Sequence, residues 1–311
     1  MALFKIENNG RLESIKEQPF KLEKEIQSLT EENLNLIFGL DFVKSELSLN
    51  NFRIDTLAYD KEAGTFVIIE YKRDKNFSVI DQGYAYLALM LNNKADFILE
   101  YNENSKESLK RNDVDWSQSR VVFISPHFTT YQREAINFKD LPIELWEIKR
   151  YHNKTVNFSQ IKTSGAQESI KTIARTDNVV DKVSKEVKVY TEQDHINKVD
   201  QETIEMYQVL KERILGLDDN IIAQPKKQTI GFKIESQIFC DVVIQNHALK
   251  IYLNLKSGDL EDSKKIARDV SNVGHWGNGS YEIKVKDLED VEYILSLIKQ
   301  SVRRNKSNLS R

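Results

Sequence analysis

The sequence predicts an α/β domain with a mixed central sheet, followed by a smaller α+β domain. Three observations support this prediction. Residues 1–150 carry the patterns of a helix, three strands, a second helix and further strands, in that order. Residues 151–190 are polar and poor in aromatic side chains, so we expect a linker there. Residues 191–311 then carry a second set of helix and strand patterns.

In the first domain, residues 13–38 have the apolar spacing of a helix, with a restart at which Thr30 is the N-cap. Asn50 and Asn51 suit a two-residue turn between two strands, because Asn tolerates positive φ. The apolar run 66–69 is typical of a strand covered on both faces. The expected strands are residues 42–49, 52–59, 65–72, 95–100, 120–125 and 142–150, and the further helices are 78–92 and 128–137.

In the second domain, Thr191 and Asp194 resemble a capping box that opens a helix over residues 192–215, and Gly216 would end this helix. Strands are expected near 227–234, 237–244, 248–255 and 280–285, with one helix after 257–259 and a last one at 288–303. The sequence therefore predicts a compact α+β arrangement for this part of the chain.

The composition excludes several classes of protein. The chain has 311 residues, of which 40% are hydrophobic and 30% charged, as is typical of soluble globular proteins. No apolar run approaches the roughly 20 residues that span a bilayer, and residues 1–10 lack the pattern of a secretory signal. We therefore expect a cytoplasmic protein with no membrane partner. The single cysteine, Cys240, excludes an internal disulfide framework.

The net charge of −3 argues against nonspecific coating of nucleic acid, although a local basic stripe would suffice for binding. Residues 299–311 form one such local excess, because they contain no acidic residue. Its basic residues are Lys299, Arg303, Arg304, Lys306 and Arg311. This segment is interpreted either as a solvated basic tail or as a phosphate-binding tail.

One group of residues has the pattern of a metal-binding active site. Asp55 lies within an apolar strand, and Glu70 and Lys72 lie two residues apart at the end of the next strand, on one face of the sheet. If these strands pair through a turn at 61–64, Asp55 comes close to Glu70. Two carboxylates then form a hard-oxygen site suited to Mg²⁺ or Mn²⁺. Lys72 would orient or help to deprotonate a water molecule and stabilise charge on a phosphoryl group.

The Glu-x-Lys spacing is not informative by itself. It recurs at Glu147/Lys149, Glu186/Lys188 and Glu282/Lys284. The copy at Glu70 differs because it follows four apolar residues and has Asp55 on the preceding strand. A structural ion pair remains the alternative, since buried charges are normally paired.

Gln82 and Tyr86 lie four residues apart and share one face of the helix expected at 78–92. Alone, they would form a partly exposed polar edge. Next to the Asp55, Glu70 and Lys72 motif, they would point back at the metal site and bind a phosphate or water.

At this point residues 20–100 resemble the PD-(D/E)XK nuclease superfamily, which has the restriction-endonuclease-like fold, and they are most similar to its RecB-type and NucS-like branches. The matching residues are Asp55, Glu70, Lys72, Gln82 and Tyr86. The resemblance implies that the Asp and Glu ligate a divalent metal, that the Lys is catalytic and that the Gln and Tyr support the site.

The chain departs from the family pattern at Ile54, where many members have proline. Family members often add a further glutamate as a metal ligand. Glu46, on the first expected strand, is the candidate here, and Glu31 and Glu32 are weaker ones.

The second domain resembles an uncharacterised domain that recurs behind such nuclease-like modules and has been labelled transport-related. We discount a transporter, because the chain has no apolar span. The stretch 274–279 is interpreted either as a glycine-rich turn in which Trp276 caps the core, or as a loop whose exposed Trp276 stacks on a base with help from Tyr281 or Lys256.

Two hypotheses follow. The first is an endonuclease that uses Mg²⁺ or Mn²⁺ to hydrolyse phosphodiester bonds of nucleic acid, with DNA as the expected substrate. Substrate contacts are assigned to Tyr86, Arg53 and Trp276. The second domain would provide substrate selection or oligomerisation, such as a homodimer. The alternative is a non-catalytic regulatory protein that binds nucleic acid or a ligand on the same scaffold.

Overall fold

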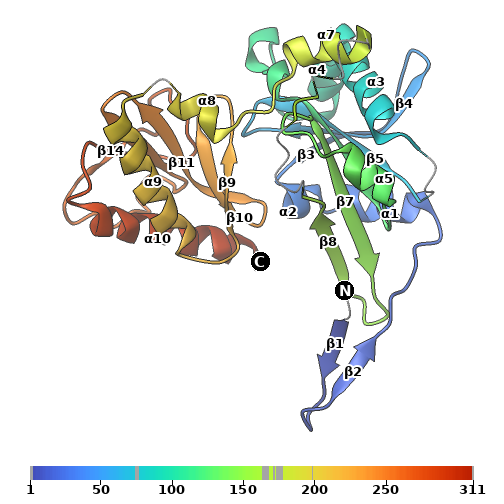
Figure 1. Ribbon diagram of the computed structural model, residues 1–311, viewed down its shortest axis with the longest axis horizontal. Helices are drawn as coiled ribbons and strands as arrows, with labels where there is room; N and C mark the ends of the chain where they lie inside the picture. The colour runs from blue at the N-terminus through green and yellow to red at the C-terminus, as the bar shows by residue number, and fades with distance from the viewer. Residues whose placement is uncertain are drawn as a thin grey trace. The chain divides into compact units, whose positions relative to one another are not determined.

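A computed structural model of the protein describes residues 3–73, 77–162, 168–170, 172, 178–197 and 199–309. The chain divides into two compact units, residues 1–189 and 190–311 (Figure 1). The region expected as a linker contains strand β8 (Val156–Gln160) and helix α7 (Asn178–Glu186). Helix α7 packs on helix α3 (Val79–Asn92). The described part of the expected linker therefore belongs with the first unit.

The first unit is built on a six-stranded sheet in the order β3-β4-β5-β6-β7-β8. Its other strands are β3 (Asp41–Leu49), β4 (Phe52–Asp60), β5 (Thr65–Tyr71), β6 (Arg120–Ser125) and β7 (Ile143–Arg150). Strands β5, β6 and β7 pair in parallel, whereas the remaining neighbours are antiparallel. The predicted mixed sheet is confirmed.

Helices cover both faces of this sheet. All seven residues of β5 are buried, and their side chains alternate between two cores. Phe66 and Ile68 face the core beneath α3, whereas Val67 and Ile69 face the core beneath α1 and α2. Because alternation has a period of two, Glu70 lies on the α3 face. The other elements of this unit are α1 (Glu23–Glu31), α2 (Leu34–Phe38), α4 (Lys94–Asn104), α5 (Thr130–Ala135), β1 (Leu3–Ile6), β2 (Leu12–Ile15) and two 3₁₀ turns, Arg111–Asp113 and Trp116–Gln118.

The two turns that align β3, β4 and β5 lie where the sequence predicted them. Asn50 adopts φ of 53° in the β3–β4 turn, and Gly64 adopts φ of 63° in the β4–β5 turn. Three other predictions were wrong. The helix expected over residues 13–38 begins only at Glu23, because Leu12–Ile15 form strand β2. Residues 95–100 lie in helix α4, in which Phe97 and Tyr101, four apart, are buried while Leu99 is exposed. Thr30 lies inside α1, where its Oγ1 donates to the carbonyl of Ile26, so it is not an N-cap.

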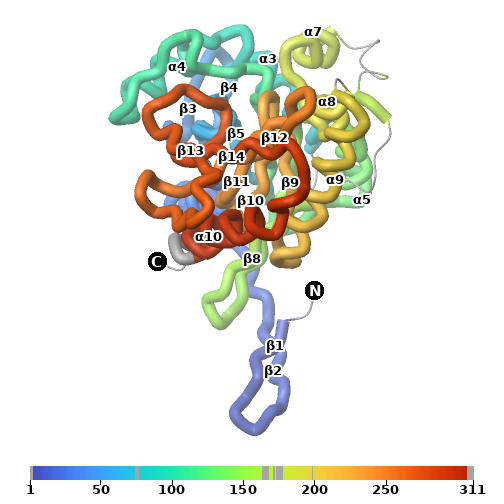
Figure 2. Tube along the Cα trace, turned by 90° about the vertical axis from the view of Figure 1, so that its left-hand side faces the viewer, coloured from blue at the N-terminus to red at the C-terminus, as the bar shows by residue number. Residues whose placement is uncertain are grey.

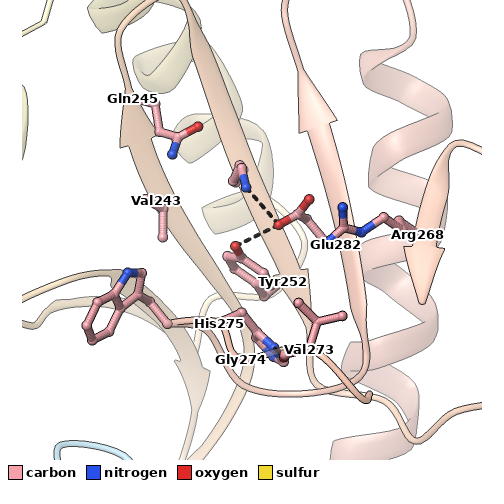
Figure 3. A pocket seen from close by; sticks show the side chains of 10 residues that line it. Val243, Gln245, Tyr252, Arg268, Val273, Gly274, His275 and Glu282 are labelled. Carbon is pink, nitrogen blue, oxygen red and sulfur yellow. Dashed lines mark hydrogen bonds and ion pairs between the residues drawn. The ribbon is translucent and has the colours of Figure 1, made fainter. Parts of the chain in front are cut away.

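The second unit contains a six-stranded antiparallel sheet in the order β13-β14-β12-β11-β10-β9 (Figure 2). Its strands are β9 (Ile221–Pro225), β10 (Ile230–Ile234), β11 (Gln237–Gln245), β12 (Ala248–Leu253), β13 (Ala267–Asp269) and β14 (Tyr281–Val285), and its helices are α8 (Glu192–Ile196), α9 (Gln201–Leu215) and α10 (Val291–Leu309). Apolar residues of α9 and α10 pack against one face of the sheet. The other face carries polar side chains, including Tyr252 and Glu282 (Figure 3). The predicted α+β unit is confirmed.

Strands β9 and β13 were not predicted, and three further details of this unit differ from the sequence prediction. The helix expected at 192–215 divides in two, because Asp200 caps α9 by accepting a hydrogen bond from the Thr203 N–H at 2.9 Å. Turns replace the helix expected after 257–259. The basic residues 299–309 lie in α10 rather than in a loose tail, and Lys306 and Arg304 form ion pairs with Asp218 and Asp259. Arg311 lies outside the described residues.

No helix in the described part of the chain is both long enough and apolar enough to cross a membrane.

Gly279 provides a test of the second unit. It adopts φ of 89°, and a Cβ atom there would lie 1.9 Å from the carbonyl oxygen of Leu253. We expect Gly279→Ala to lower the free energy of unfolding by about 2 kcal/mol or more, because the backbone must shift. Gly274→Ala is the control, since a Cβ at Gly274 meets no atom within 4 Å. Equal thermal stabilities of the two variants would contradict this packing.

Candidate active site

Asp55 and Glu70 face each other at the point where strands β4 and β5 separate. The backbone ladder ends at the pair Thr56 and Ile69. Beyond it, side chains accept the backbone hydrogen bonds. The Asp55 N–H donates to Glu70 Oε1 at 3.1 Å, and the Tyr71 N–H donates to Asp55 Oδ2 at 3.1 Å. These reciprocal bonds fix the two carboxylates side by side, as the sequence predicted.

Lys72 lies beside this pair. Its Nζ is 3.3 Å from Glu70 Oε2, and its side chain is 22% exposed whereas that of Glu70 is 1% exposed. Its backbone N–H donates to the carbonyl of Ile124 on β6, which continues the parallel pairing past the end of β5. The lysine is therefore held at the edge of the sheet with its ammonium group next to the buried carboxylate.

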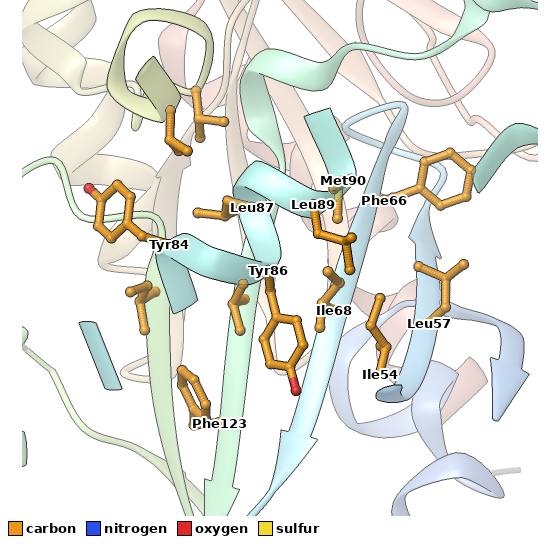
Figure 4. Packing of buried hydrophobic residues seen from close by; sticks show 14 of the residues in the cluster. Ile54, Leu57, Phe66, Ile68, Tyr84, Tyr86, Leu87, Leu89, Met90 and Phe123 are labelled. Carbon is orange, nitrogen blue, oxygen red and sulfur yellow. The ribbon is translucent and has the colours of Figure 1, made fainter. Parts of the chain in front are cut away.

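Helix α3 supplies Gln82 and Tyr86. The helix begins where Ser78 Oγ accepts a hydrogen bond from the Asp81 N–H. Gln82 Nε2 donates to the Tyr86 hydroxyl at 3.3 Å, and this hydroxyl donates to the Arg53 carbonyl at 3.2 Å. Tyr86 extends from α3 across the sheet (Figure 4). Burial raises the pKa of Tyr86, and the charge of Glu70 raises it further. The structure thus brings both α3 residues to the carboxylates.

The electrostatics of the carboxylate pair are unfavourable. Burial, followed by the neighbouring Asp55 carboxylate, raises the pKa of Glu70 to about 7, although Lys72 opposes the shift. Burial also raises the pKa of Asp55, which the Tyr71 N–H and Lys72 only partly offset. A buried glutamate and a half-buried aspartate therefore face one lysine, and the site carries more negative charge than its own cation compensates.

Glu46, the expected third ligand, is engaged elsewhere. It adopts φ of 53° in β3, its Oε2 lies 3.0 Å from Arg53 Nε and its Oε1 lies 3.4 Å from Lys24 Nζ. Its charge raises the pKa of Asp55 only as a minor contribution. Within the described ranges, no three His, Cys, Asp or Glu side chains are grouped to hold a metal ion. The structure thus brings together two carboxylates rather than three.

The other two expected substrate contacts are Arg53 and Trp276. The Arg53 side chain is 68% exposed and pairs with Glu46. Trp276 belongs to the second unit, where it lines a separate pocket. Within the part of the chain that the structure describes, the Arg53 side chain forms no hydrogen bond or ion pair with Asp55 or Glu70.

Sequence reasoning missed Gln27 on helix α1. This side chain is 4% exposed, and its Nε2 donates to the Asp55 carbonyl at 2.8 Å and to Ser45 Oγ at 3.1 Å. Glu31, one turn later, accepts from Gln27 Nε2 at 3.0 Å and from Thr56 Oγ1 at 2.6 Å. Gln27 thus holds the backbone of β4 at Asp55, and Glu31 holds the side chain of Thr56 on the same strand. Their four-residue spacing on one helix face was the only available signal.

The donor set fits Mg²⁺ or Mn²⁺. Both cations prefer oxygen ligands, and Mg²⁺ is commonly held through one or two protein carboxylates while it keeps several water molecules. Asp55 and Glu70 supply two such carboxylates, and their mutual repulsion would be relieved by a cation. Neither histidine nor cysteine takes part, so the pair does not resemble a zinc site.

The chain is 51% identical to an uncharacterised protein from Haemophilus influenzae over 294 residues, which cover 94% of this chain and 97% of that protein. The two proteins belong to one family. Residues 192–303 also match the model of a domain of unknown function, DUF5655. The transport-related label expected for this domain has no support in these matches.

Solved structures give weaker matches. A repair endonuclease from Pyrococcus abyssi is 19% identical, with a TM-score of 0.25 over 42% of this chain and 49% of that one. A complex of EndoMS with double-stranded DNA is 16% identical, with a TM-score of 0.26 over 47% of this chain and 64% of that one. The chain thus spans less than two thirds of each, and similarity at this level carries no argument about function.

Proposed function

We propose that the first unit is an endonuclease that uses Mg²⁺ or Mn²⁺ to hydrolyse phosphodiester bonds, with DNA as its substrate. The observation that supports this proposal is the convergence of Asp55 and Glu70, whose carboxylates are locked together by reciprocal bonds to the backbone. A lysine and a hydrogen-bonded Gln82–Tyr86 pair complete the site.

Each side chain has a role that its position allows. Asp55 and Glu70 would hold the cation. A cation bound there would neutralise charge on the phosphodiester and acidify a water molecule. Lys72 is placed to orient that water and to stabilise the negative charge that develops on the phosphoryl group. Gln82 and Tyr86 would position the substrate phosphate through their polar atoms.

A purely structural ion pair explains this arrangement less well. A structural pair would match one acid with one base, as Lys149 does with Glu17 at 3.5 Å. Here two acids lie beside Lys72, and burial raises the pKa of both although the lysine opposes the shifts. Such shifts are common at functional sites, where burial and like charges are arranged for chemistry.

The test compares two lysines. Lys72 and Lys149 both follow a glutamate by two residues on a strand, and both side chains are 22% exposed. We expect Lys72→Ala to lower the rate of DNA cleavage by about a hundredfold or more, because it removes a charge that stabilises the transition state. Lys149→Ala should cleave at the wild-type rate. The measurement is single-turnover cleavage of a labelled duplex in Mg²⁺ or Mn²⁺.

The substrates are DNA in linear, nicked, circular and single-stranded form, and RNA. Each reaction has a control in EDTA. Cleavage by Lys72→Ala at the wild-type rate would overturn the proposed role of this site. If no substrate is cut with either metal, the non-catalytic binding protein becomes the better description.

A further inference from the structure

A pocket of about 520 Å³ lies on the polar face of the second sheet, opposite the face that α9 and α10 cover. Tyr252 and Glu282 line its middle, Arg268 lies on one side, and Val243 and Gln245 lie on the other (Figure 3). Pockets of this volume hold small molecules of the size of a mononucleotide. Neither the nuclease proposal nor the match to DUF5655 assigns a role to this pocket.

The loop that closes one side of the pocket, residues 270–280, is firmly held. The His275 ring stacks on Tyr252 with centroids 5.0 Å apart and an interplanar angle of 14°. Its Nδ1 lies 2.7 Å from the Val273 carbonyl, and its Nε2 lies 2.9 Å from the Gly279 carbonyl. Since both ring nitrogens contact backbone carbonyls, His275 ties the two ends of the loop together.

The buried carboxylate of Asp241, on strand β11, also holds this loop. Asp241 is 1% exposed, and its Oδ2 accepts hydrogen bonds from the Asn278 N–H at 2.9 Å and from Asn278 Nδ2 at 2.8 Å. Gly277 packs so closely on Tyr252 that a Cβ there would lie 2.3 Å from the tyrosine ring. Gly277 and Gly279 therefore allow close packing, and the loop is held in place at several points.

This loop presents Trp276 to the solvent. The indole is 69% exposed while it lines the pocket, so it does not cap the core. Single exposed aromatic side chains are common on protein surfaces, but this one lies at the edge of a pocket. An exposed indole that is held in place at the edge of a pocket can bind a flat aromatic ligand such as a nucleobase. Stacking on a ring that is already fixed loses little conformational entropy. Tyr281 and Lys256, the expected helpers, do not line the pocket, and the Tyr281 hydroxyl instead accepts a hydrogen bond from the Gly258 N–H.

The charges in the pocket favour an anion. Glu282 Oε2 accepts hydrogen bonds from Lys250 Nζ at 2.9 Å and from the Tyr252 hydroxyl at 2.8 Å, so this lysine is neutralised. Arg268 forms no ion pair with any residue that the structure describes. Lys250 and Arg268 carry two positive charges and Glu282 carries one negative charge, so the pocket has a net positive charge of one. The planar guanidinium of Arg268 can donate two hydrogen bonds to a phosphate.

We propose that this pocket binds a nucleotide, with its base stacked on Trp276 and its phosphate at Arg268. Gln245 can both donate to and accept from the base edge, because its amide carries both kinds of group. The ligand is either a free mononucleotide or one residue of a nucleic-acid strand, since both present the same base and phosphate. This proposal stands independently of the proposed nuclease activity.

The experiment measures binding by calorimetry to the full chain, in EDTA so that no metal-dependent cleavage occurs. The probes are AMP, adenosine, ribose 5-phosphate and a short oligodeoxyadenylate. We expect AMP to bind more tightly than adenosine or ribose 5-phosphate, because only AMP offers both groups. An oligonucleotide that binds more tightly than AMP, with an advantage that Trp276→Ala removes, would identify a strand as the ligand of this pocket, whereas tighter binding of AMP would identify the free nucleotide.

Matched variants locate the binding. Trp276→Ala should weaken AMP binding by about tenfold or more, and Trp276→Phe should restore most of it because a ring remains. Arg268→Ala should bind AMP and adenosine with equal affinity, because the phosphate loses its partner. The controls are Tyr131→Ala, which removes an aromatic side chain that is 88% exposed in the first unit, and Asp55→Asn. Both controls should bind AMP as the wild type does.

Two results would overturn the proposal. One is the absence of saturable binding of AMP and of the oligonucleotide at millimolar concentration. The other is binding that Trp276→Ala and Arg268→Ala leave unchanged. Neither outcome bears on cleavage by the first unit, which is measured separately with Lys72→Ala.

Discussion

Asp55→Asn is expected to lower the rate of phosphodiester cleavage by about a thousandfold or more. Asparagine keeps the size of the side chain and can still accept the hydrogen bond from the Tyr71 N–H. It removes the negative charge that would hold a divalent cation, and losing such a cation costs several kcal/mol of transition-state stabilisation. Cleavage of labelled DNA under single-turnover conditions measures the effect.

The control for this variant is Asp181→Asn, which removes an exposed carboxylate on α7 that pairs with Lys185. It should cleave at the wild-type rate. Thermal unfolding adds a second readout, because a cation that binds only the folded state stabilises it by an amount that rises with the free cation concentration. Mg²⁺ should stabilise the wild type and Asp181→Asn but not Asp55→Asn. Equal stabilisation of all three would place the cation elsewhere.

Glu70→Gln is expected to stabilise the metal-free protein at pH 8 while it abolishes cleavage. The folded protein raises the pKa of Glu70 from 4.5 to about 7, because burial and Asp55 disfavour its ionised form. The unfolded chain therefore loses this proton at a lower pH than the folded chain does. Between the two pKa values the unfolded state becomes relatively more stable as the pH rises.

The shift corresponds to about 3 kcal/mol of destabilisation above pH 7, and this destabilisation is absent below pH 4.5. Glutamine has no such proton, so the variant should gain about 3 kcal/mol over the wild type at pH 8 and nothing at pH 4. Urea unfolding in EDTA across this pH range measures the difference. A difference that stays constant with pH would show that Glu70 is not the titrating group.

The fold and the carboxylate pair could be predicted because they depend on local rules. The turns at Asn50 and Gly64 fix the register of β3, β4 and β5, and alternation then determines which side chains share a face. Asp55 and Glu70 are neighbours as a direct consequence. The alignment of Gln82 and Tyr86 with them follows from the four-residue period of a helix.

Other features could not be predicted, because they depend on contacts between distant segments. The run 95–100 is apolar enough for a strand, and only its packing under β3 and β5 selects a helix. The edge strands β9 and β13 are short and carry little apolar pattern. Gln27 contacts Asp55 across 28 positions of sequence, a pairing that no local pattern encodes. The sequence could not decide whether Trp276 is buried or exposed, because the answer depends on His275, which packs on Tyr252 and leaves Trp276 at the surface.

The parallel pairing of β5 with β6 has a consequence for the order in which the active site forms. Strands β4 and β5 are joined by a short turn, so Asp55 and Glu70 can meet as soon as this hairpin exists. Strand β6 can pair only after the whole segment 72–119 has closed as a loop, which costs chain entropy and slows folding. We therefore expect the two acids to meet while they are still hydrated, and the electrostatic cost of burying Glu70 to fall late in folding. A nascent chain would complete the carboxylate hairpin well before the strand that buries it has been synthesised.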